Sequence, residues 1–179
     1  MATLSEPWRM ITSGFAHSDN LAGDPTSVLH IALNMYTLYI LGNLLEPVLG
    51  TRRFTLLYML SIFGGSVAVL VLGDPVGGVL GASGGVFGLM GAYFVVLRTL
   101  GQNNSGIAGI IGINLVFTFI NPGVSWEAHV GGLLVGAAVA FLYSRTRMSS
   151  QNQMQNLGLI GIAVGLSVIT FLKAISFLA

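Results

Sequence analysis

Long apolar stretches alternate with short polar ones along most of the chain. A helix that spans a membrane needs roughly 17–25 mostly apolar residues. Stretches of this kind lie at about 28–45, 54–73, 79–100, 106–121, 126–143 and 157–178. Segments rich in glycine, proline, asparagine or charge separate them, as expected for connectors. The pattern predicts an all-α, polytopic membrane helical bundle with six transmembrane helices.

The amino-acid composition is typical of an integral membrane protein. Of the 179 residues, 54% are hydrophobic and 7% are charged, whereas a soluble domain carries about 25% charged residues. The net charge is +1 and no basic cluster is present, which argues against a nucleic-acid partner. The chain has no cysteine, so disulfides and thiolate-bound metals are excluded, and nothing indicates a metal or an organic cofactor.

Positive charge is distributed unevenly among the connectors. Five arginines follow the first, third and fifth spans: Arg52, Arg53, Arg98, Arg145 and Arg147. The positive-inside rule makes these connectors cytoplasmic. The first, third and fifth spans then run inward, and each of them begins near the outer surface.

Polar residues with chemical potential gather at the outer ends of those three spans. His30 and Asn34 open the first span, Ser83 opens the third, and His129 opens the fifth. A serine becomes a nucleophile when a neighbouring base takes its proton, and an imidazole is suited to that transfer near neutral pH. No carboxylate lies at matching depth within a span. The set therefore favours a Ser–His dyad over a triad.

Hydrolysis of a peptide bond also needs donors for the developing oxyanion. His30 and Asn34 are spaced i, i+4 and share one helix face, so with the Ser83 backbone N–H they can form such a hole. The glycines of "GASGG", beginning at Gly81, permit close backbone approach to the serine. The GxxxG pair in "HVGGLLVGAA" predicts that the fifth span packs closely on the third. We expect Thr118 and other intramembrane polar residues to make interhelical hydrogen bonds or to line a wet pocket.

Four short motifs resemble the signatures of the rhomboid family of intramembrane serine proteases. They are "WR" at 8–9, "HIALN" at 30–34, "GASGGVFG" at 81–88 and "AHVGGLLVG" at 128–136, in the family's order and approximate spacing. The resemblance covers roughly residues 8–143. It implies a rhomboid-type bundle with a water-filled cavity that opens outward.

The resemblance also implies a role for each site residue. Ser83 resembles the nucleophile, and His129 resembles the general base. The oxyanion hole would comprise His30, Asn34 and the Ser83 amide, with Gly81 as the glycine two residues before the nucleophile. An aromatic residue that packs on the histidine is expected at Phe87.

The implied function is that of an intramembrane serine endopeptidase, which cuts peptide bonds in or near transmembrane segments of membrane proteins. The implied setting is a multi-pass protein, taken as one of a bacterial cell membrane, with its active site toward the outer side. Its partners would be these substrates and the lipid bilayer. No cofactor is implied, and the oligomeric state is left open.

By this interpretation the chain divides into four parts. Residues 1–27 form an outer-face loop segment, 28–143 hold the catalytic core helices, 144–156 form a cytoplasmic linker, and 157–179 hold an additional C-terminal transmembrane helix. The family normally has a further helix before the "WR" motif, and the usual first helix is expected to be missing from this chain.

Two other functions are compatible with parts of the pattern. A catalytically impaired, rhomboid-like binder of membrane proteins would fit the missing first helix, although it would have no need of both Ser83 and His129. A channel or transporter for small solutes would spread its polar groups through the membrane depth, whereas here they gather at one end.

Overall fold

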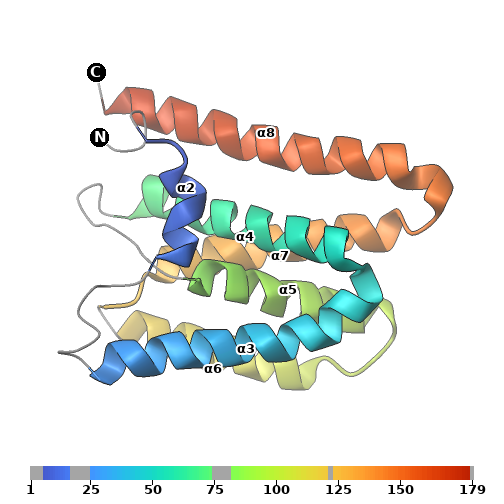
Figure 1. The fold of residues 1–179 in the computed structure, drawn as a ribbon, viewed down its shortest axis with the longest axis horizontal. Coiled ribbons are helices and arrows are strands. Elements are labelled where there is room, and N and C mark those ends of the chain that lie inside the picture. The colour runs from blue at the N-terminus through green and yellow to red at the C-terminus, as the bar shows by residue number, and fades with distance from the viewer. Residues whose placement is uncertain (1–5, 17–24, 74–81, 121–122, 178–179) are drawn as a thin grey trace.

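The chain folds as a bundle of apolar helices (Figure 1). The computed structural model describes residues 6–16, 25–73, 82–120 and 123–177, with side chains from residue 28 onward in the second of these ranges. The elements are α2 (Arg9–Thr12), the 3₁₀ turn η1 (Ser13–Phe15), α3 (Pro25–Leu49), α4 (Thr51–Leu72), α5 (Ser83–Thr99), α6 (Ser105–Ile120), α7 (Trp126–Arg145), the 3₁₀ turn η2 (Ser149–Gln151) and α8 (Asn152–Ser176). No strand occurs within these residues, which confirms the predicted all-α membrane bundle.

The helices differ in how far they can reach across a membrane. Within the described ranges, four stretches are long and apolar enough to cross one: Val28–Leu49, Thr51–Leu72, Trp126–Arg145 and Ser149–Ser176. Helices α5 and α6 are apolar but shorter, at 17 and 16 residues. At 1.5 Å per residue they extend about 24–26 Å, slightly less than the roughly 30 Å of a hydrocarbon core.

The observed helix bounds correct the prediction at two connectors. Helix α3 continues through Pro47 to Leu49, four residues beyond the predicted end, and α4 begins at Thr51. The segment "EPVLGTRR" is therefore helical on both sides of Gly50, which makes the turn with a φ of 81° that favours glycine. Helix α8 begins at Asn152, five residues before the predicted start.

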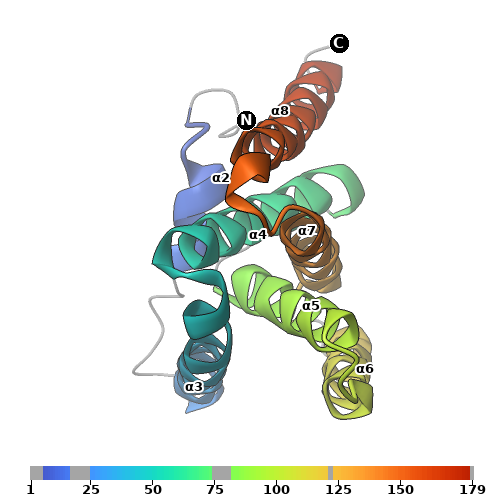
Figure 2. The same cartoon turned by 90° about the vertical axis from the view of Figure 1, so that its right-hand side faces the viewer.

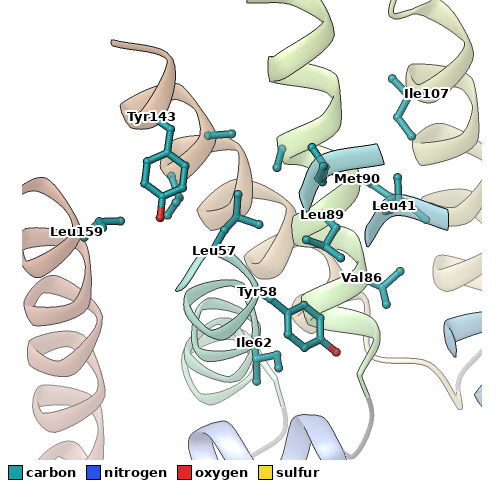
Figure 3. Packing of buried hydrophobic residues seen from close by; sticks show 14 residues of the cluster. Leu41, Leu57, Tyr58, Ile62, Val86, Leu89, Met90, Ile107, Tyr143 and Leu159 are labelled. Carbon is teal, nitrogen blue, oxygen red and sulfur yellow. The ribbon is translucent and has the colours of Figure 1, made fainter. Parts of the chain in front are cut away.

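Helices α4, α5 and α7 form the centre of the bundle, and α3, α6 and α8 lie around them (Figure 2). The apolar core lies where the three central helices meet, around Leu57 and Leu89 (Figure 3). These two side chains and that of Val139 are inaccessible to solvent. Most large side chains of the peripheral helices are exposed, as expected for surfaces that face lipid.

Close backbone approach, rather than large side chains, joins α5 to α7. A Cβ atom added at Gly132 would collide with the carbonyl oxygen of Gly84, and one added at Gly136 would collide with that of Gly88. This contact along two helical turns confirms the close packing that the GxxxG pair predicts.

Helix α4 approaches α7 in the same way. A Cβ at Gly131 would lie 2.5 Å from the carbonyl oxygen of Gly64, and one at Gly65 would lie 2.9 Å from that of Ala128. Helices α4 and α5 therefore both pack on α7 through main-chain contacts near the start of α7.

Helices α3, α5 and α7 all begin at the same end of the bundle, on the left in Figure 1. The candidate residues on these helices therefore lie at one end. The arginines of the predicted cytoplasmic connectors lie at the other end.

Candidate active site

Ser83 is the first residue of α5 and is half-buried. The backbone N–H groups in the first turn of a helix have no intrahelical acceptor. Those in the first turn of α5 can therefore donate to an acceptor beside the Ser83 side chain. The positive end of the helix dipole favours negative charge at the same place. Gly81, also predicted to belong to this site, lies outside the described residues.

The ring of His129 lies against the face of α5 that carries Ser83. It stacks on Phe87, with ring centroids 4.0 Å apart and ring planes 14° apart. Phe87 follows Ser83 by four residues, so the two side chains project from one helix face, a single turn apart. The stacking partner expected at Phe87 is thus present.

Two hydrogen bonds of Thr118, on α6, define the state of the imidazole. The Thr118 hydroxyl donates to the backbone carbonyl of Asn114 at 2.8 Å, and its oxygen lies 2.8 Å from Nδ1 of His129. A hydroxyl has one hydrogen to donate, and the carbonyl can only accept. Nδ1 must therefore carry the ring hydrogen and donate it to Thr118, an assignment that follows from the network of donors and acceptors.

The other ring nitrogen, Nε2, is then an acceptor with a lone pair. It is buried and has no hydrogen-bond partner among the described residues, in a side chain only 4% exposed. Buried polar atoms are nearly always paired, so an unpaired one calls for an explanation. A basic nitrogen kept free beside a serine-bearing helix face has the properties of a general base.

No carboxylate takes the place of Thr118. Glu127 accepts a hydrogen bond of 2.7 Å from the Ser125 hydroxyl, which also caps α7 by accepting from the Ala128 N–H. Among the described residues, no group of three or more His, Asp or Glu side chains could hold a metal ion. The partner of Nδ1 of His129 is therefore a hydroxyl and not a carboxylate within the described residues.

The start of α3 contributes the remaining predicted residues. Asn34 is buried, and its side-chain N–H donates to the His30 carbonyl oxygen at 3.0 Å. An amide carries two N–H donors, so this bond leaves a second one available. His30 lies one helical turn before Asn34, at the end of the bundle where α5 and α7 also begin.

The sequence predicted that Thr118 makes an interhelical hydrogen bond or lines a wet pocket, and it did not identify His129 as the partner. The available signal was the spacing of Asn114 and Thr118, two polar residues four apart on an otherwise apolar helix. That spacing marks one face of α6 as polar. It gives no indication of which neighbouring helix the face meets.

A family model and several known proteins match most of the chain. The family model described as Rhomboid domain matches residues 4–146. The chain is 33% identical to RHOMBOID-like protein 6, mitochondrial, of Arabidopsis thaliana, over 85% of this chain and 48% of that protein. It is 32% identical to Rhomboid protease GluP of Bacillus subtilis (89% and 31%), and 29% identical to Rhomboid-related protein 2 of Mus musculus (76% and 48%). The chain spans less than half the length of each of these three relatives.

Proposed function

This chain belongs to the rhomboid family, and from that premise we propose that it is a serine endopeptidase that hydrolyses peptide bonds in or near transmembrane segments of other membrane proteins. One observation carries the proposal. The Nε2 atom of His129 is buried, unpaired among the described residues and held in the acceptor tautomer, over the helix face that carries Ser83.

The proposed reaction uses two residues for covalent chemistry and proton transfer. The Ser83 Oγ attacks the scissile carbonyl carbon while its proton passes to Nε2 of His129. The tetrahedral intermediate collapses as the same nitrogen returns the proton to the leaving amine, which leaves an acyl-enzyme on Ser83. Water, deprotonated by Nε2, then releases the acid and regenerates the hydroxyl.

Donors near Ser83 would stabilise the oxyanion of that intermediate. The first-turn N–H groups of α5 and the dipole of that helix favour negative charge beside Ser83. The second N–H of Asn34 and the His30 side chain are the further candidates. Preorganised donors of this kind are each worth on the order of 10²–10³ in rate.

Thr118 acts in this proposal as a positioning residue. By accepting from Nδ1–H it keeps the ring hydrogen on the nitrogen away from the reaction, the role that an aspartate has in a triad. A neutral hydroxyl stabilises the transient imidazolium less than a carboxylate does. It also avoids burying a second charge in the membrane, which is costly.

The substrate must expose its backbone to reach Ser83. A transmembrane helix satisfies its own N–H and C=O groups, so a scissile carbonyl becomes accessible only where the helix unwinds. The site lies at the end of the bundle opposite the five connector arginines. By the positive-inside rule we infer that it opens on the outer side of the membrane, and we propose a bacterial cell membrane as its setting.

A covalent probe tests the proposal directly. A phosphonate that reacts with activated serines is expected to add once to the folded protein, and peptide mapping should locate the adduct on Ser83. Heat-unfolded protein should not react, because the hydroxyl then has no neighbouring base. An adduct on a different serine, or no adduct, would contradict the proposal and favour a binder without catalytic activity.

Thr118→Val is expected to lower kcat by about 10- to 100-fold with little change in KM, because the imidazole loses its tautomer control but the substrate contacts remain. Thr118→Ser, which keeps the hydroxyl, should recover most of the activity. The measurement is steady-state cleavage of a transmembrane substrate in proteoliposomes.

Thr99→Val is the matched control for this prediction. Thr99 makes the same kind of hydrogen bond to its own helix, 2.7 Å to the Val95 carbonyl, but lies exposed at the far end of α5. Its kcat should be unchanged. Equal loss in Thr99→Val and Thr118→Val would show that the effect is structural.

A further inference from the structure

A polar pocket lies between α4 and α8, at the end of the bundle opposite the candidate active site. Its volume is about 210 Å³. Two leucines and five polar side chains line it, the latter being Arg52, Arg53, Asn152, Gln155 and Asn156. It lies partly on α8, which is outside the residues that match the family model.

Arg53 is held in place by side chains from two other helices, α7 and α8. Its Nε donates to the Gln155 Oε1 at 2.9 Å, and its guanidinium lies over the ring of Tyr143, 5.7 Å from the centroid. Gln155 is itself 5% exposed and donates to the backbone and side-chain oxygens of Thr146 at 3.0 and 2.8 Å. One edge of the guanidinium is therefore fixed, so the remaining N–H groups are preorganised.

The pocket carries positive charge without a matching acid. No Asp or Glu lines it, and neither Arg52 nor Arg53 has an ion-pair partner among the described residues. The two arginines are adjacent and lie in the first turn of α4, where the helix dipole is also positive. A bound anion would offset the repulsion among the Arg52 charge, the Arg53 charge and the positive end of the α4 dipole.

We propose that this pocket binds a phosphate group, supplied by the headgroup of an anionic phospholipid. A guanidinium presents paired N–H donors that match phosphate oxygens, and the amides of Asn152 and Asn156 add neutral donors. Leu56 and Leu159 continue the lining on its apolar side, where acyl chains would lie. Basic pockets between helices at the cytoplasmic end suit such headgroups.

The bound lipid would join α8 to the core of the bundle. Helix α8 has few buried residues, and its polar contacts with the core run through Gln155. A phosphate held by Arg52 and Arg53 on one side and by α8 amides on the other would bridge the two parts. This inference does not depend on proteolytic activity.

Native mass spectrometry of the full chain in detergent tests the proposal. The parent protein is expected to retain one phosphatidylglycerol and to lose phosphatidylcholine with the same acyl chains. Arg52→Gln and Arg53→Gln should each lower phosphatidylglycerol retention at least fivefold. Arg98→Gln is the matched control, since it removes one charge at the same end of the bundle but outside the pocket.

A second variant keeps the result interpretable if an arginine variant folds poorly. Asn156→Asp leaves the Arg53–Gln155 hydrogen bond intact and adds a carboxylate to the lining, so it should lower retention to a similar degree. Thermal unfolding of each variant, measured in parallel, identifies any that have lost the fold.

Inorganic phosphate distinguishes the two sources of the ligand. If millimolar phosphate binds to the parent in an arginine-dependent way while phosphatidylglycerol is not retained, the phosphate site stands and its ligand is a free anion. The proposal is overturned if the parent retains both lipids equally and binds no phosphate. It is also overturned if Arg98→Gln loses as much phosphatidylglycerol as the pocket variants.

Discussion

Replacing Ser83 by alanine is expected to lower kcat for a transmembrane substrate by on the order of 10⁴-fold or more, to the background of the assay. The alanine has no oxygen to attack the carbonyl, so no acyl-enzyme forms and both halves of the reaction fail together. Binding should persist, because the surrounding helix faces are unchanged. The measurement is cleavage of a fluorogenic transmembrane substrate in proteoliposomes, with substrate affinity determined separately.

The control must separate chemistry from folding. Ser83 is half-buried at a helix start, so removal of its hydroxyl should change the free energy of unfolding by less than about 1 kcal/mol. Ser167→Ala, an exposed position on α8, should retain full activity. Substantial cleavage by a purified Ser83→Ala protein would mean that a different residue is the nucleophile.

Gly132→Ala is expected to have the second largest effect, on both stability and activity. The new methyl group would collide with the carbonyl oxygen of Gly84, a main-chain atom that cannot move without displacing α5. Overpacking at such a contact costs about 1–3 kcal/mol, and more when the backbone must shift. Separating α5 from α7 also moves His129 relative to Ser83, and a misplacement of about 1 Å can lower the rate 10²-fold.

Gly109→Ala is the matched control for this substitution. A Cβ at Gly109 would meet no atom within 4 Å, and the residue lies exposed on α6. Since alanine favours a helix over glycine, stability should be unchanged or slightly higher. The measurements are thermal unfolding and the rate of substrate cleavage for both variants. Equal stability and equal activity of Gly132→Ala and Gly109→Ala would refute the role assigned to the backbone contact.

The sequence predicted the apolar helices well, because their signal is local. Apolar length, glycine-rich packing motifs and the side of the arginines are properties of short segments. The position of Ser83 at a helix start agrees with the pattern of apolar spans, and the stacking of Phe87 on His129 agrees with what the resemblance implied. The helical path through Pro47 was missed, because proline, glycine and charge together are typical of a connector.

Contacts between distant segments could not be predicted. Thr118 and His129 lie on different helices, so their hydrogen bond depends on how each helix is rotated about its axis. Arg53 and Gln155 are 102 residues apart, and neither is unusual in its local sequence. The tautomer of the imidazole and the pocket at the far end both follow from such pairings, which only the packed bundle reveals.

The main-chain contact between α5 and α7 has a consequence for how such a protein can diversify. Where Gly132 meets the Gly84 carbonyl and Gly136 meets the Gly88 carbonyl, the separation of the serine-bearing and histidine-bearing helices is set by main-chain contact. Residues on α3 and α6 other than His30, Asn34 and Thr118 can therefore change in size and polarity without altering the spacing of α5 and α7. Divergence to about one third identity, as between this chain and its relatives, can accumulate at such positions without changing the contact between α5 and α7.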